Sequence, residues 1–216
     1  MTQAQEVENQ LRKMILDLEV GPGERLTERW AESHFSASRT PVRAALLRLE
    51  SEGLVCREGR GWMVSPIDLH EMEQLFVYRQ ALEVAALRIS ASTIGDTELK
   101  KLEEIMGVCT PESSAEVVHD AGTAFHILLA SLAGNVFIND GLQDALRRLS
   151  RARWLDTAPE HHGWEEHRAI IAALKNRDAE RAVVMLEQHL QKSCERLLLT
   201  MRTNKRTLRA SGIIIG

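Results

Sequence analysis

Apolar residues in the first part of the chain recur at the spacing of amphipathic helices. They follow the helical period between Val7 and Leu18, and the sequence Gly-Pro-Gly at 21–23 ends this pattern. Thr27 is placed to cap a short second helix over residues 28–34, because a threonine hydroxyl accepts hydrogen bonds from the free amides of a helix start. The pattern therefore predicts two helices before residue 35.

A third helical pattern begins after Ser38, which we expect to cap it, and ends at Gly53. Its apolar positions share one face: Val42, Ala45, Leu46 and Leu49. Two strand-like runs follow, over 54–57 and 62–65, and the turn sequence Glu-Gly-Arg-Gly joins them. Three helices and a hairpin are the layout of a winged helix-turn-helix, and Pro66 marks its expected end.

The rest of the chain carries helical patterns and no convincing strand. Six helices are predicted, over residues 69–92, 96–108, 113–133, 136–155, 164–176 and 178–203. Each break between them contains Gly, Pro, Asn or Asp, which end or cap helices. The expected fold class is therefore mainly α, with a winged helix-turn-helix over 1–66, an all-α six-helix bundle over 67–205 and a flexible tail over 206–216.

Composition limits the classes of protein that remain. The 216 residues are 44% hydrophobic with a formal net charge of −4, so any DNA-binding surface must be a local basic patch. Three cysteines without a CxxC pair, Cys56, Cys109 and Cys194, indicate reduced thiols in the cytoplasm. The start of the chain does not read as a signal peptide, and the apolar runs are too short to span a membrane, so we expect no membrane partner.

Two stretches of the first domain resemble the GntR family of bacterial regulators. They are Leu-Thr-Glu-Arg-Trp-Ala-Glu at 26–32 and Ser-Arg-Thr-Pro-Val-Arg-Ala-Ala-Leu-Leu-Arg-Leu-Glu-Ser-Glu-Gly-Leu-Val at 38–55. The second half is similar to the FadR-type (FCD) effector domain, and six helices rather than seven point to the VanR-like group. The resemblance implies a homodimeric, cytoplasmic transcription regulator, which we expect to be a repressor. Its implied partners are double-stranded operator DNA and a small effector, expected to be a carboxylate.

A recognition helix enters the major groove with its N-terminus first, so its opening turn should carry hydrogen-bond donors. The third helix carries four such residues: Ser38, Arg39, Thr40 and Arg43. Arginine can bind guanine with two hydrogen bonds, and serine and threonine can reach phosphates. The resemblance adds Arg29 and a wing tip in the minor groove, formed by Gly59, Arg60 and Gly61. Residues 29–61 hold six arginines and four glutamates, so this surface is basic only if folding gathers the arginines on one face.

Three histidines stand where the resemblance implies metal ligands, each on a different predicted helix: His126, His167 and His189. Imidazoles that converge in a helical bundle bind divalent metals such as zinc or nickel. The resemblance also implies an aspartate one turn before the first histidine, but Gly122 occupies that position. Asp120 and His119 are badly placed to replace it. Either water or the effector completes a three-histidine site, or the site has lost its metal.

Arginines supply the candidate contacts to the effector. Arg79 and Glu83 match an Arg-x3-Glu pattern at the start of the effector domain, where Arg79 can bind a carboxylate. The alternative is an ion pair between these two residues, one helical turn apart. Arg151 and Arg153 can line the same cavity or be surface charges.

Two other functions fit parts of the pattern. Three histidines with an open position also occur in zinc enzymes, and Glu165 or Glu166 could then act as a general base. The histidines lack HExxH spacing, however, and the N-terminal motif would have no role in an enzyme. A helical interaction protein without a ligand is the third reading. We therefore expect a regulator that is not an enzyme.

Overall fold

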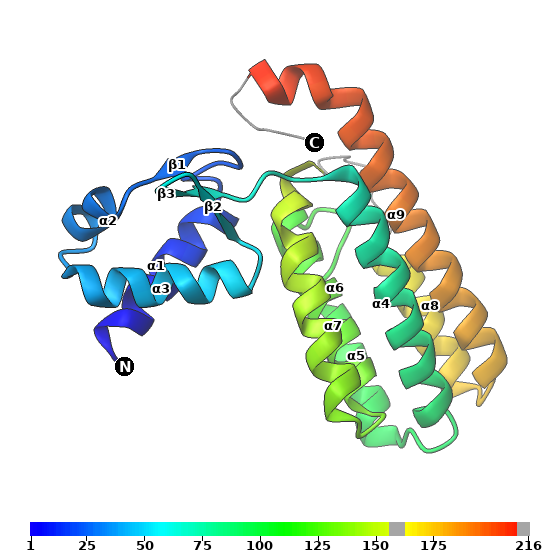
Figure 1. The fold of residues 1–216 in the computed structure, drawn as a ribbon. Helices are drawn as coiled ribbons and strands as arrows, with labels where there is room; N and C mark the ends of the chain where they lie inside the picture. Colours follow the sequence, from blue (N-terminus) through cyan, green and yellow to red (C-terminus); the bar gives the residue numbers. More distant parts are fainter. Residues whose placement is uncertain (156–162, 211–216) are drawn as a thin grey trace. The chain divides into compact units, whose positions relative to one another are not determined.

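The structure, a computed structural model, describes residues 1–155 and 163–210 (Figure 1), with side chains described for 1–114, 116–152 and 163–203. Over these residues the chain forms nine α-helices, one 3-10 helix and one three-stranded sheet, so the mainly α fold class is confirmed. The chain divides into two compact units: the first holds Met1–Glu71 and the described chain from Met201 onward, and the second holds Met72–Thr200.

The first unit has the three helices and the hairpin that the sequence predicts, in the predicted order, and one additional short strand. It contains α1 (Gln3–Leu16), β1 (Arg25–Leu26), α2 (Glu28–His34), α3 (Arg39–Ser51), β2 (Val55–Glu58) and β3 (Gly61–Val64). The Thr27 hydroxyl accepts a hydrogen bond from the Trp30 amide at 3.1 Å and so caps α2 as expected. Ser38 stands at the cap position of α3, but its side chain makes no capping hydrogen bond, which corrects the expected cap.

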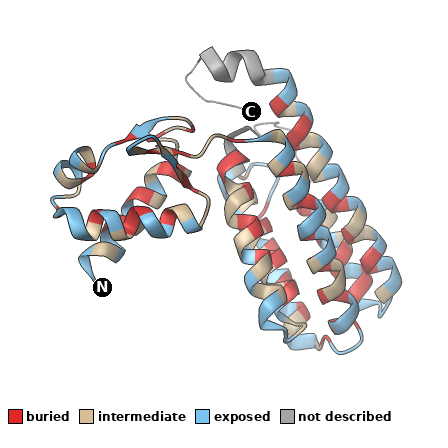
Figure 2. Ribbon diagram, viewed as in Figure 1, coloured by how far each residue is buried: buried red, intermediate tan, exposed pale blue. Residues whose placement is uncertain are grey.

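The sheet of the first unit is antiparallel, in the order β1-β3-β2. The hairpin of β2 and β3 lies within one residue of the predicted strands, and Gly59 in its turn has φ +58°, which favours glycine. The two-residue strand β1 was not predicted, because a strand this short has no alternation of its own and exists through its pairing with β3. Beneath the sheet, α1 and α3 share a core that includes Leu11, Leu46 and Trp62 (Figure 2).

The second unit is built from six α-helices and one 3-10 helix, η1; the first of these helices begins three residues before the unit, and the last extends beyond its end at Thr200. They are α4 (Leu69–Ser90), α5 (Asp96–Gly107), α6 (Ala115–Ser131), α7 (Val136–Leu149), η1 (Ser150–Leu155), α8 (Gly163–Lys175) and α9 (Ala179–Ala210). The six-helix bundle is thus confirmed. No helix of the described ranges is long and apolar enough to cross a membrane.

Two helix ends differ from the prediction. The helix expected over 136–155 ends as an α-helix at Leu149, where the Ser150 hydroxyl donates to the Arg147 carbonyl at 2.7 Å and helps to tighten the chain into η1. Helix α9 continues past residue 203 to Ala210, because no Gly or Pro interrupts it there. The first five residues of the expected tail, 206–210, are therefore helical, and 211–216 lie outside the described residues.

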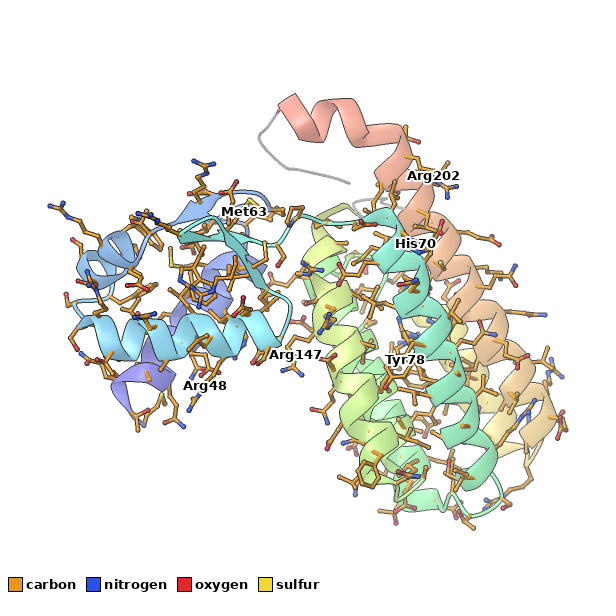
Figure 3. All side chains as sticks on the ribbon, in the orientation of Figure 1. Arg48, Met63, His70, Tyr78, Arg147 and Arg202 are labelled. Atoms are coloured by element: carbon orange, nitrogen blue, oxygen red, sulfur yellow. The ribbon has the colours of Figure 1, made fainter. Side chains whose placement is uncertain are left out.

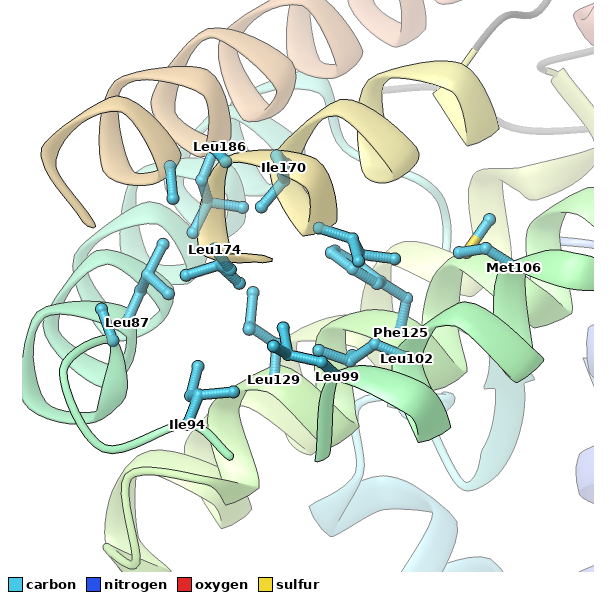
Figure 4. Packing of buried hydrophobic residues seen from close by; sticks show 14 of the residues in the cluster. Leu87, Ile94, Leu99, Leu102, Met106, Phe125, Leu129, Ile170, Leu174 and Leu186 are labelled. Carbon is cyan, nitrogen blue, oxygen red and sulfur yellow. The ribbon is translucent and has the colours of Figure 1, made fainter. Parts of the chain in front are cut away.

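The core of the second unit joins five of its helices (Figure 4). Leu87 of α4, Leu102 of α5 and Phe125 of α6 meet residues of α8 and α9 in one buried cluster. The Phe125 ring stacks on the His167 ring, with 4.4 Å between ring centroids. The apolar core thereby holds one of the three candidate metal ligands in position.

Candidate functional site

The structure brings the three predicted histidines together inside the second unit. His126 lies on α6, His167 on α8 and His189 on α9, and all three are buried. The Nε2 atom of His167 lies 3.1 Å from that of His126 and 3.0 Å from that of His189. Two nitrogens bound to one tetrahedral zinc ion are about 3.3 Å apart. This spacing fits three nitrogens that share one metal ion.

Carboxylates orient two of these imidazoles from outside. The Nδ1 atom of His126 lies 2.5 Å from Glu83 Oε2, and the Nδ1 atom of His189 lies 2.7 Å from Glu166 Oε2. An imidazole that donates from Nδ1 to a carboxylate turns the lone pair of Nε2 toward the other side of the ring. Both rings therefore present a ligand atom to the shared centre.

The protonation states favour metal binding. Burial, together with the charge of Arg79, holds the pKa of His126 well below its ordinary value. Burial also lowers the pKa of His189, although the Glu166 hydrogen bond opposes this effect. Burial alone would raise the pKa of Glu166, but hydrogen bonds from His189 and Lys192 outweigh it and bring the pKa to about 2. Neutral imidazoles backed by an ionised carboxylate are the form that binds a metal.

Gly122 faces this centre, as its spacing from His126 predicts. A Cβ at this position would lie 3.2 Å from Cε1 of the His167 ring. Asp120 is exposed, in agreement with the sequence argument that it points elsewhere. Within the described part of the chain, these three histidines are the only group of histidine, cysteine or acidic side chains that could hold a metal ion.

The candidate effector residues have different surroundings. Arg79 is buried, and its Nε donates to Glu83 Oε1 at 2.6 Å, which is the intrahelical pair given as the alternative in the sequence analysis. Because Glu83 also contacts His126, it links Arg79 to the histidine centre. Arg151 is buried in η1, where its Nε donates to the Arg148 carbonyl. The side chain of Arg153 lies outside the described residues.

Sequence reasoning missed the structural role of two carboxylates. Glu83 was expected only as a partner of Arg79, and Glu166 only as the base of an alternative enzyme. Each lies more than 20 residues from the histidine it contacts: the separations are 43 for Glu83 and His126 and 23 for Glu166 and His189. No local spacing signals such a pair, so only the packing of the helices reveals it.

The first unit gathers the predicted DNA-binding residues around the start of α3. Ser38, Arg39, Thr40 and Arg43 are all exposed, as is Arg29 on α2. The guanidinium groups also meet acidic residues of α2. Arg39 Nε lies 3.2 Å from Glu32 and 3.4 Å from Glu28, and Arg43 Nε lies 3.2 Å from Glu28.

The other three arginines of residues 29–61 lie in the wing hairpin and further along α3. Arg60 is exposed beside Gly59 and Gly61 in the turn between β2 and β3. Arg48, further along α3 (Figure 3), donates to Glu8 of α1 at 2.9 Å. The Arg57 guanidinium lies 3.6 Å from the centroid of the Trp62 ring. All six arginines are exposed, and four of them lie on α2, at the start of α3 and at the wing tip, where the sequence predicts DNA contacts: Arg29, Arg39, Arg43 and Arg60.

Comparisons with known families match both units. Residues 3–64 match the family described as bacterial regulatory proteins, gntR family, and residues 74–192 match the FCD domain. The chain is 27% identical to the HTH-type transcriptional repressor RspR of Escherichia coli, over 88% of this chain and 87% of the relative. It is also 27% identical to the Nta operon transcriptional regulator of Aminobacter aminovorans, over 88% and 91% of the two chains.

Solved structures share the fold. The structure of E. coli McbR/YncC has a TM-score of 0.74 and 20% identity, over 91% of this chain and 97% of that chain. A GntR transcriptional regulator from Rhodococcus has a TM-score of 0.76 and 24% identity, over 92% and 98%. The matched families and relatives are transcription regulators and not enzymes, which confirms the expectation that excluded the metalloenzyme.

Proposed function

This chain belongs to the GntR family of bacterial regulatory proteins and carries an FCD domain. We therefore propose that it is a homodimeric repressor, and that a small carboxylate releases it from operator DNA. Members of this family are DNA-binding transcription regulators. We further propose that this protein represses transcription, binds a carboxylate effector and forms a dimer. Residues 1–66 bind DNA, and residues 67–205 bind the effector and dimerise. The cytoplasm is the expected location, because the operator lies there.

DNA binding is assigned to the start of α3, to Arg29 and to the wing tip. The exposed Arg39 and Arg43 support base reading, since arginine can bind the guanine edge in the major groove with two hydrogen bonds. Ser38 makes no capping bond, so its hydroxyl is suited to a phosphate. A single recognition helix reads few bases, so two copies on a pseudo-palindrome are needed for selectivity.

The convergence of three buried imidazoles carries the sensing function. His126, His167 and His189 are spaced for one divalent ion, with zinc or nickel as the candidates. Burial lowers the pKa of His126 and of His189, and a carboxylate contacts each of these two rings from outside. When bound, such an ion supplies a Lewis acid that can bind an anionic oxygen of the effector. Gly122 brings no carboxylate to the centre, which leaves a coordination position for that oxygen.

Arginines complete the proposed effector site. Arg79 is buried and joined through Glu83 to His126, so its charge lies close enough to the centre to lower the pKa of that histidine. We propose that Arg79 binds the second carboxylate oxygen of the effector. We also propose that Arg151 and Arg153 line the effector site. The residues that hold the ion come from three helices, so binding there can shift α6, α8 and α9 against one another.

The test combines selection of an operator with release by acids. Selection from a random duplex pool should return a pseudo-palindrome whose half-sites lie about one helical turn apart, near 34 Å. A panel of small carboxylates should then release the protein from that duplex only when zinc or nickel has been added back to chelator-treated protein. Selection of a site without two-fold symmetry would contradict the proposal that the protein binds DNA as a dimer. Release that is equal with and without metal would contradict the sensing site.

A further inference from the structure

The start of the recognition helix carries a charge-compensated network. Glu28 and Glu32 lie one turn apart on α2, and Arg39 and Arg43 lie one turn apart on α3. Helix α2 packs against α3 within the winged helix-turn-helix (Figure 1), so the two pairs meet. The contacts run in sequence from Glu32 to Arg39, from Arg39 to Glu28 and from Glu28 to Arg43.

Glu28 occupies the centre of this network. It alone contacts both arginines among the described side chains, at 3.4 Å and 3.2 Å, and its own side chain is only 25% exposed. Arg39 and Arg43 remain 68% and 56% exposed, so DNA can reach them. An isolated surface ion pair contributes little to stability, but two arginines around one carboxylate form a network with less freedom of movement.

We propose that Glu28 is a specificity-determining residue, which neutralises Arg39 and Arg43 in the DNA-free protein and thereby suppresses binding to DNA of unselected sequence. The inference rests on the proposed role of the two arginines in reading the operator.

The chemistry of the two DNA targets differs in a way that Glu28 can use. A DNA phosphate interacts with an arginine mainly through its negative charge, and Glu28 already places a negative charge beside each arginine. Exchanging the carboxylate for a phosphate therefore adds little binding free energy. A guanine edge offers two acceptors, O6 and N7, to a guanidinium fork. The contacts to Glu28 involve Nε of each arginine. The terminal Nη atoms can therefore bind guanine while Glu28 keeps its contact.

The test compares Glu28→Gln with Glu19→Gln. Both substitutions remove one negative charge from the same unit, and Glu19 is an exposed residue of the loop between α1 and β1. A labelled 30-base-pair duplex of random sequence is titrated with each protein at a series of salt concentrations. We expect Glu28→Gln to bind this duplex about 3–10 times more tightly than Glu19→Gln does. Its plot of log affinity against log salt should steepen by about one unit, because one more phosphate is neutralised.

Two further variants make the result specific. Glu32 pairs with Arg39 and not with Arg43, so Glu32→Gln should raise the affinity for random DNA less than Glu28→Gln does. Glu28→Asp retains the charge and should restore part of the wild-type weakness toward random DNA. On the selected operator, the ratio of specific to random affinity should fall at least threefold for Glu28→Gln. Thermal melts followed by circular dichroism establish that each variant is folded. If Glu28→Gln does not fold, Glu32→Gln is compared with Glu19→Gln instead.

The outcomes separate this inference from the proposed function. If the wild-type protein binds neither random nor selected duplexes, the proposed DNA-binding surface itself fails. If it binds both, but Glu28→Gln matches Glu19→Gln in affinity and salt dependence, only the role of Glu28 is overturned. An equal loss of affinity for both duplexes would also overturn it, because Glu28 would then support the fold of α2 and α3 rather than selectivity.

Discussion

At the scale of single residues, Gly122 is the position where this chain departs from the metal site that its resemblance implies. Its α-carbon faces His167, and an added Cβ would lie 3.2 Å from Cε1 of that ring, so the ring must shift by a few tenths of an ångström. We predict that Gly122→Asp tightens binding of zinc or nickel and weakens binding of the acid. The new carboxylate adds a ligand, lowers the charge of the centre and fills the position of the effector oxygen.

Calorimetry with metal and with acid checks this prediction, and Gly122→Ala serves as the control for the added Cβ. The alanine variant should not tighten metal binding, since it brings no oxygen ligand. Unchanged acid affinity in Gly122→Asp would contradict an effector oxygen at the centre, as would a purified protein that takes up no metal under any condition.

Glu166 offers a second test at this scale, because it contacts the metal site only through His189. Its Oε2 lies 2.7 Å from Nδ1 of His189, and Lys192 donates to its other oxygen at 3.0 Å. Removing such an outer carboxylate typically lowers metal affinity 10–100-fold. We therefore predict a loss of about this size for Glu166→Gln in competition with a metal-binding dye. Glu165→Gln, at an exposed neighbouring position, should stay close to the wild-type affinity.

Among the secondary-structure elements, α3 carries the proposed DNA contacts in its first two turns, and Arg48 lies further along the helix. Arg43 and Arg48 have similarly exposed side chains, at 56% and 53%, but Arg43 pairs with Glu28 of α2, whereas Arg48 pairs with Glu8 of α1. We predict that Arg43→Ala costs about 1–3 kcal/mol of operator binding and relaxes discrimination at one position of each half-site. Arg48→Ala should leave discrimination unchanged. Anisotropy titrations on operators with single base changes measure both, and equal selectivity in Arg43→Ala and wild type would rule out this placement of the recognition helix.

For the molecule as a whole, the proposed function requires two DNA-binding units to act together. A pseudo-palindromic operator matches a two-fold symmetric protein, and preformed pairing avoids the cost of assembling two monomers on the DNA. We predict that the chain is a dimer at micromolar concentration without DNA. Light scattering at several dilutions measures the mass directly against the 24.3 kDa of one chain. A monomer throughout that range would mean that DNA assembles the pair.

Local chemistry made most of the fold predictable. Thr27 caps α2 with its own hydroxyl, and the ends of α4, α5 and α8 lie within two residues of the predicted ones. Caps, glycines and prolines act within one turn of the chain, so the sequence carries their effect directly. The exceptions have non-local or mixed causes: β1 exists only by pairing with β3, and α7 gives way to η1 where side chains bind the carbonyls of its last turn.

The candidate sites show the same division. The candidate residues can be named from the amino-acid sequence alone, because three histidines on three predicted helices and arginines at the start of the third helix are visible in it. The contacts of those residues become visible only when the helices pack. The tertiary structure set the imidazole nitrogens about 3 Å apart, placed Glu83 and Glu166 behind them and paired Arg39 and Arg43 with Glu28. Such contacts depend on the packing of separate helices, and residue spacing along the chain contains no measure of that distance.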